Sequence, residues 1–141
     1  MSQELCFHIE NENIYLEQVL VEDRGIPIFF LCRGREQYCM ALCTDMEEWK
    51  YIVVKVSLTD VYDLLHGKIS MRDAILKQMD YWDIVSGEEI SLDVVERKHM
   101  NTIRMEVLPE AEACFNIVTE QVKRFVQKFD KENFVNAEIS L

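Results

Sequence analysis

A chain of 141 residues with 49% hydrophobic residues and a formal net charge of −11 fits one domain with a full hydrophobic core. The excess of carboxylates argues against direct nucleic-acid binding and against docking on anionic lipid, because both need clustered Lys and Arg. No apolar run approaches the length of a membrane span, so we expect no membrane partner.

The first half of the chain has the pattern of an antiparallel strand meander. Apolar alternation and turn residues predict a short strand at Leu5–Ile9 and longer strands at 14–23, 26–33, 37–44 and 49–56. Arg24-Gly25 is typical of a hairpin turn, because glycine supplies a positive φ. Both faces of 26–33 are apolar, so we expect both to be covered. One face of 37–44 carries only small residues, which predicts the close approach of a helix or another backbone.

The second half predicts a pair of short helices and one long helix. Ser57 and Ser70 are each followed three residues later by Asp, the spacing of a capping box, and Gly67 fits the left-handed residue that ends a helix. Further strands are expected at 81–85, 90–96 and 103–108. The last helix is expected over 116–129, where Val118, Val122, Phe125 and Phe129 share one apolar stripe.

These elements predict a single α+β domain over 1–141 with a mainly antiparallel sheet. The sheet is packed by the short helical pair and the C-terminal amphipathic helix. The core is expected within 14–129, and the tail, 130–141, is expected at the periphery.

Residues 64–74 read Leu-Leu-His-Gly-Lys-Ile-Ser-Met-Arg-Asp-Ala, and an aromatic strand at Tyr81-Trp82 follows. This motif resembles a pattern of small uncharacterised bacterial α+β proteins, in which a strand meander precedes it. The resemblance covers about residues 14–96. It implies the same architecture and a bacterial source, and it implies no activity, because the motif contains no catalytic residue.

Five cysteines, Cys6, Cys32, Cys39, Cys43 and Cys114, follow a polar N-terminal sequence that lacks the pattern of a secretory leader. We therefore expect reduced thiols in a cytoplasmic protein. Cys39 and Cys43 have ligand-like spacing, but on a strand they lie about 13 Å apart, too far to share a zinc ion. The sequence predicts no metal and no cofactor.

No motif indicates catalysis. The chain has neither a Gly-x-Ser-x-Gly elbow nor a phosphate-binding glycine loop, and its three histidines are dispersed. Glu48-Trp49-Lys50 matches Glu-x-Lys, a fragment of metal-dependent nuclease signatures. With Asp23 or Asp45 as a further ligand, it leaves a cryptic metal-dependent hydrolase as one alternative.

Two sets of residues are candidates for an interface. The first is aromatic and is also compatible with a place in the core: Trp49, Tyr51, Tyr81 and Trp82. The second is acidic and would suit a negative face if the fold gathers it: Glu10, Glu12, Glu17, Glu22 and Asp23.

We predict a non-enzymatic cytoplasmic interaction module that binds a protein partner or itself as a homodimer, since three modest helices are few to cover both faces of the sheet. The second alternative is an acidic inhibitor, similar to anti-defence or anti-CRISPR proteins, that occupies a basic nucleic-acid-binding surface of a partner.

Overall fold

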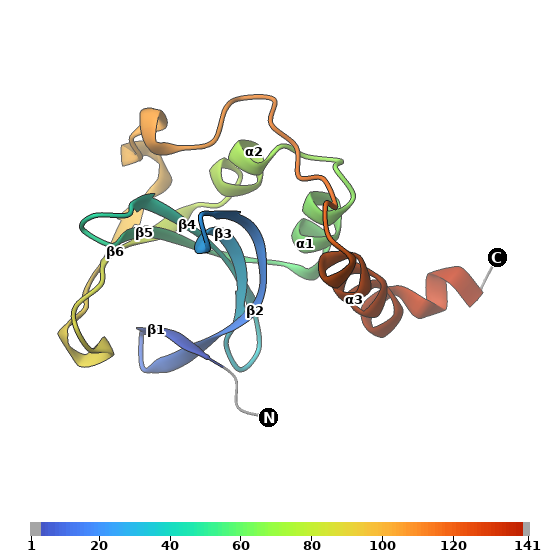
Figure 1. Cartoon of the computed structure of the whole chain (residues 1–141), viewed down its shortest axis with the longest axis horizontal. Coiled ribbons are helices and arrows are strands. Elements are labelled where there is room, and N and C mark those ends of the chain that lie inside the picture. Colours follow the sequence, from blue (N-terminus) through green and yellow to red (C-terminus); the bar gives the residue numbers. More distant parts are fainter. Residues whose placement is uncertain (1–3, 140–141) are drawn as a thin grey trace.

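The computed structural model describes residues 4–139 and confirms the α+β class with a mainly antiparallel sheet. The sheet has seven strands in chain order and curls into a half-barrel, with the helices on its outer side (Figure 1). The strands are β1 (Leu5–Ile9), β2 (Glu12–Asp23), β3 (Ile26–Arg33), β4 (Tyr38–Asp45), β5 (Lys50–Val56), β6 (Asp80–Val85) and β7 (Val94–His99). Helices α1 (Leu58–Leu65) and α2 (Met71–Leu76) lie between β5 and β6, and α3 (Glu120–Ile139) follows the sheet.

In the described part of the chain, the buried residues of the inner face all belong to strands. Cys32 and Cys39 stand opposite one another on β3 and β4 within this cluster. The small side chains Cys39 and Ala41 of β4 face this interior, where they belong to the same cluster as Phe7 and Ile9 of β1. The buried members of the inner cluster are Phe7, Ile9, Ile14, Phe30, Cys32, Cys39, Ala41, Val53, Trp82 and Ile84.

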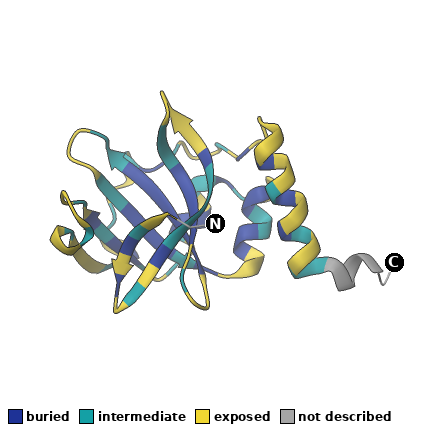
Figure 2. Cartoon of the chain, turned by 60° about the horizontal axis from the view of Figure 1, so that its bottom comes forward, coloured by how far each residue is buried: buried dark blue, intermediate teal, exposed yellow. Residues whose placement is uncertain are grey.

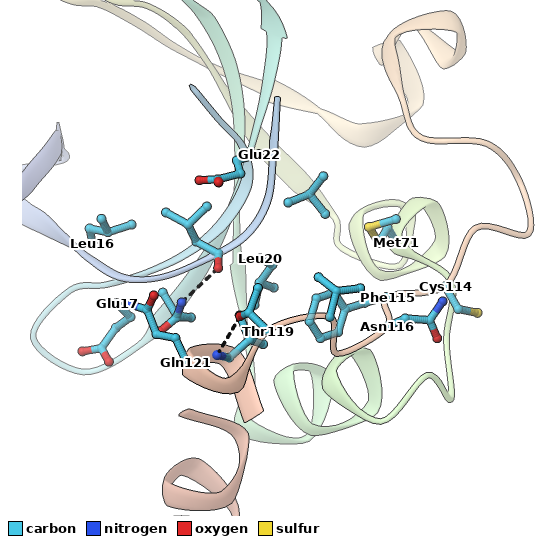
Figure 3. A pocket seen from close by; sticks show the side chains of 15 residues that line it. Leu16, Glu17, Leu20, Glu22, Met71, Cys114, Phe115, Asn116, Thr119 and Gln121 are labelled. Atoms are coloured by element: carbon cyan, nitrogen blue, oxygen red, sulfur yellow. Dashed lines mark hydrogen bonds between the residues drawn. The ribbon is translucent and has the colours of Figure 1, made fainter. Parts of the chain in front are cut away.

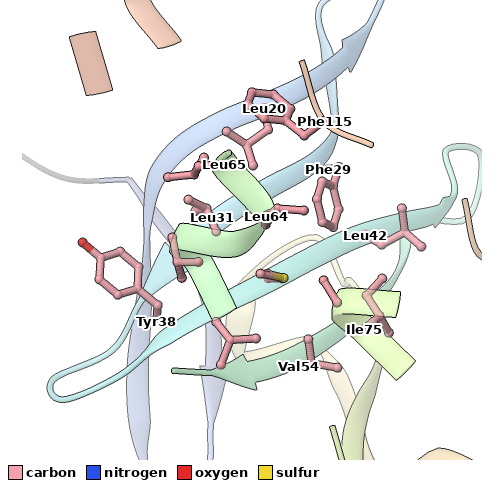
Figure 4. Packing of buried hydrophobic residues seen from close by; sticks show 14 of the residues in the cluster. Leu20, Phe29, Leu31, Tyr38, Leu42, Val54, Leu64, Leu65, Ile75 and Phe115 are labelled. Carbon is pink, nitrogen blue, oxygen red and sulfur yellow. The ribbon is translucent and has the colours of Figure 1, made fainter. Parts of the chain in front are cut away.

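The outer face of the sheet packs against the three helices. Side chains such as Leu31 and Val54 contact Leu64 of α1 and Ile75 of α2 within one cluster (Figure 4). Helix α3 adds Phe129, whose ring meets the ring of Tyr38 at a centroid distance of 5.6 Å. Figure 2 shows α3 buried along one side and exposed along the other, as an amphipathic helix on a sheet should be.

The predicted N-caps at Ser57 and Ser70 are confirmed, and of the two it is Ser57 that forms the full capping box. The Ser57 hydroxyl accepts a hydrogen bond from the Asp60 N–H, and the Asp60 carboxylate accepts one from the Ser57 N–H, both at 3.0 Å. Gly67 has φ +68° just after α1, and Ser70 caps α2. The Arg24-Gly25 turn is confirmed as well, with positive φ at both residues.

Two of the strands predicted in the second half are wrong in place or in kind. Residues 103–108 do not form a strand, because the chain leaves the sheet after β7 and makes short 3₁₀ turns at Met100–Thr102 and Met105–Val107. Residues 90–92 also form a 3₁₀ turn, so β7 begins at Val94.

The last helix begins later and runs further than predicted. The Thr119 hydroxyl accepts from the Val122 N–H at 3.2 Å, so α3 starts at Glu120 and Val118 lies before it, 77% exposed. The tail from Phe134 is helical to Ile139, with a kink at Phe134, and Ser140 and Leu141 lie outside the described residues. Among the residues described, α3 included, no helix combines the length and the apolar character needed to cross a membrane.

Candidate binding groove

A groove of about 600 Å³ lies between β2 and the segment that leads into α3 (Figure 3). Strand β2 forms one wall, and residues from 114 to 122 form the other, with Met71 of α2 at one end. The residues that line it are Leu16, Glu17, Gln18, Val19, Leu20, Val21, Glu22, Met71, Cys114, Phe115, Asn116, Val118, Thr119, Gln121 and Val122.

The β2 wall exists because β2 is much longer than β1. Strand β1 pairs with β2 only as far as Tyr15, and the Leu16 N–H then donates to the Glu4 carbonyl at 2.8 Å. Beyond Leu16, β2 pairs with β3 on one side only, and within residues 4–139 no strand pairs with its other edge. That edge faces the groove.

The opposite wall is held in place by the core. Phe115 and Val122 are both nearly fully buried, and Phe115 packs near Leu20 of β2 within the outer cluster (Figures 3 and 4). The loop before this wall is tied to α2, because the Met71 N–H donates to the Ala113 carbonyl at 2.9 Å. Both walls are therefore anchored to the folded core, β2 through Leu20 and the opposite wall through Phe115 and Val122.

The lining combines apolar side chains with two carboxylates. Glu17 and Glu22 are the charged residues in the lining, and the described part of the chain contributes no Lys, Arg or His to it. Two aliphatic side chains remain exposed on opposite walls, Val21 at 36% and Val118 at 77%. Such a surface suits a ligand with both apolar groups and positive charge.

The predicted aromatic residues do not share one surface. Trp49 is exposed in the β4–β5 turn, where its φ is +54°. Tyr51 is half-buried and packs edge-on against Phe7 at a centroid distance of 5.3 Å. Tyr81 and Trp82 are buried on opposite faces of the sheet.

The predicted acidic residues divide between two places. Glu10 lies in the β1–β2 turn and pairs with Lys55 of β5 and Arg97 of β7, both at 3.4 Å. The Glu12 carboxylate accepts from the Arg35 N–H at 2.6 Å. Glu17 and Glu22 line the groove, and Asp23 pairs with Arg24 beside it.

The Glu10 pairs close the open side of the half-barrel. The Lys55 ammonium and the Arg97 guanidinium both lie over the ring of Trp82, at 4.9 and 5.3 Å from its centroid. Arg97 also donates to Asp80 at 2.7 Å, and the hydrogen bond from Arg97 lowers the pKa of that carboxyl. Ion pairs thus link the first hairpin to the last strand.

The residues suggested for a hydrolase serve a turn. Asp45 accepts from the N–H groups of Glu48 and Glu47, at 3.1 and 2.9 Å, and these bonds lower its pKa. Lys50 pairs with Glu48 at 2.9 Å on the surface. The described residues contain no cluster of three or more His, Cys, Asp or Glu that could hold a metal ion.

The cysteines are free thiols, and three of them are buried in the sheet. Burial raises the pKa of Cys39 to about 12, and burial together with a hydrogen bond to Cys6 raises the pKa of Cys32. Cys39 and Cys43 lie on one strand, as predicted. His66, at the end of α1, contacts the Asp130 carboxylate of α3 at 2.8 Å.

Comparison of the chain with known proteins gives no match to a family model, to a curated protein or to a solved structure. The resemblance of residues 64–74 to a bacterial family therefore stays a prediction.

Sequence reasoning placed Glu17 and Glu22 in its acidic set but missed the groove itself. The opposite wall lies far away in the sequence, so no local pattern joins the two. One feature of the sequence does indicate the groove, because the predicted first strand is much shorter than the second. A strand that extends beyond its neighbour leaves part of its edge unpaired.

Proposed function

We propose that the protein is a non-enzymatic interaction module of the cytoplasm that binds a basic, partly apolar segment of a partner protein in the groove between β2 and α3. The observation that carries this proposal is the lining, which combines apolar side chains with Glu17 and Glu22 and contains no Lys, Arg or His from the described residues. Lys or Arg of the partner would pair with these carboxylates, and its apolar side chains would cover Val21 and Val118.

The chemistry of the described side chains supports binding over catalysis. Buried thiols whose pKa is raised are poor nucleophiles, and Asp45 is occupied by the N–H groups of its own turn. Five free cysteines are what a reducing compartment would maintain, which supports the cytoplasm.

Charge also favours a different protein over a second copy as the occupant. Each chain carries a formal net charge of −11, so two acidic grooves brought together would repel one another. The acidic-inhibitor alternative gains little support, because Glu10 and Glu12 are engaged away from the groove and the five acidic residues form no single face.

The experiment is selection from a library of random displayed peptides on the immobilised full chain. We expect enrichment of sequences that mix Lys or Arg with aliphatic residues. The double variant Glu17→Lys/Glu22→Lys should lose the selected peptides. The matched control is Glu88→Lys/Glu89→Lys, which makes the same charge change at exposed residues between β6 and β7.

Retention of the peptides by the control and their loss from the groove variant would support the proposal. Selection of no peptides, or equal loss from both variants, would contradict it, since equal loss would mean that only the net charge attracts the peptides.

A further inference from the structure

The groove wall formed by β2 is a strand edge with backbone groups available for pairing. The stretch Glu17–Glu22 pairs with β3 on one side, and within residues 4–139 its other side has no strand partner. At about 3.3 Å per residue this edge spans roughly 20 Å. Open edges of this kind accept extended peptides in many complexes, because main-chain hydrogen bonds supply affinity.

One backbone acceptor on β2 is already satisfied by a side chain. The Gln18 amide donates from Nε2 to the Val19 carbonyl at 3.0 Å, and both residues line the groove (Figure 3). This bond stands in for a bond from a neighbouring strand. A side-chain amide that binds the adjacent residue can turn away when a backbone N–H replaces it.

The register shifts between β2 and β3 limit what can be added. They occur between Leu16 and Gln18, between Val19 and Val21, and between Val21 and Glu22. Such bulges twist an edge and interrupt its regular spacing, which is one way that proteins avoid long edge-to-edge aggregation. The edge therefore suits a short segment and disfavours a long ribbon or a second sheet.

We infer that the partner segment binds as a short added β-strand along the outer edge of β2, with basic side chains near Glu17 and Glu22 and aliphatic side chains between Val21 and Val118. This inference rests on the proposed function and adds the mode of binding. In a strand, alternate residues point to opposite faces, so a segment that alternates basic and aliphatic residues groups each kind on one face, where it can meet the carboxylates or the apolar side chains of the lining.

The test uses a capped synthetic peptide of about six residues that alternates lysine and valine, together with two backbone N-methylated forms. One form is methylated at every lysine and the other at every valine. Alternate N–H groups of a strand point to opposite edges, so only one of these two sets can face β2. Binding to the full chain is measured by titration with ¹H–¹⁵N correlation spectra.

We expect the unmodified peptide to shift the amide signals of Glu17–Glu22 and of residues 115–122. We expect one methylated form to bind at least about tenfold more weakly and the other to bind as the parent does. Gln18→Ala should bind the parent peptide at least as tightly as the wild type, because the competing side-chain amide is gone.

The outcomes separate the binding mode from the function. Shifts in the groove with equal effects of the two methylated forms, or a tenfold loss in Gln18→Ala, would overturn the strand mode and leave a groove that reads side chains only. Absence of shifts in the groove, or shifts that persist in Glu17→Lys/Glu22→Lys, would overturn the binding of a basic segment there as well.

Discussion

Replacement of Asp60 by alanine is expected to destabilise the protein by about 3 kcal/mol. Asp60 is only 7% exposed, and its carboxylate joins the start of α1 to the end of α2. It accepts from the Ser57 N–H at 3.0 Å and from the Gln78 amide at 3.1 Å, and it pairs with Lys77 at 2.6 Å.

The magnitude follows from these contacts. Each of the two hydrogen bonds to the charged acceptor contributes about 1.5 kcal/mol, the low end of the range for such bonds. We use the low end because the Ser57 N–H can bind water once the carboxylate is removed. The Lys77 side chain is 45% exposed, so its ion pair adds at most about 1 kcal/mol. The control is Asp63→Ala on the same helix, where the half-buried carboxylate makes no hydrogen bond or ion pair within residues 4–139, and we expect a change within about 0.5 kcal/mol.

The effect should depend on pH. Burial raises the pKa of Asp60, but the hydrogen bonds from Lys77, Ser57 and Gln78 outweigh it, and the pKa lies below its ordinary value. A carboxylate whose pKa is lowered by folding contributes stability above the pKa of the unfolded chain, about 3.9, and loses it as the pH falls through the folded value. The gap between wild type and Asp60→Ala should therefore narrow below about pH 4.

The assay is urea unfolding at a series of pH values, with the slope of the free energy checked for constancy. A loss for Asp60→Ala of less than about 0.5 kcal/mol at pH 7, or a gap that stays constant at acid pH, would refute the reasoning.

Two further predictions test the inner face and a tight turn. Exposed Cys114 should react with a thiol reagent at pH 8 well before Cys39, because burial raises the pKa of Cys39 to about 12. Mass mapping of the labelled peptides checks this prediction, and equal labelling of the two cysteines would contradict it. Gly34→Ala should destabilise the protein by about 1 kcal/mol, because a Cβ there would collide with the Glu12 carboxylate that caps the turn. In a Glu12→Ala background the same substitution should cost less stability. An equal loss of stability in both backgrounds would show that the collision is not the cause.

The parts of the fold that the sequence predicts well are those determined by local chemistry. The caps at Ser57 and Ser70 and the turn at Arg24-Gly25 each depend on residues within a few positions of one another, and all three are confirmed. The strand 26–33 is also confirmed, because its two apolar faces need covering on both sides.

The parts that it misses depend on distant partners. Ile103 and Val107 alternate like a strand, and within residues 4–139 the outer edge of β7 has no strand partner, but this segment leaves the sheet and forms short 3₁₀ turns. It is held instead by Arg72 of α2, which donates to the Met105 carbonyl at 3.4 Å and to the Pro109 carbonyl at 2.7 Å. The groove was missed for the same reason, because its two walls are distant in the sequence and are brought together by tertiary packing, such as that of Phe115 and Val122 in the outer cluster.

The order of the strands also affects how the chain reaches this structure. Each strand lies beside its predecessor in the chain, so most sheet pairing closes only a short turn, which carries a small entropic penalty and favours rapid folding. The exception is the junction of β5 with β6, where residues 57–79 must first be looped out. The docking of α1 and α2 shortens this loop, so we expect the pairing of β6 with β5 to depend on the docked helical pair.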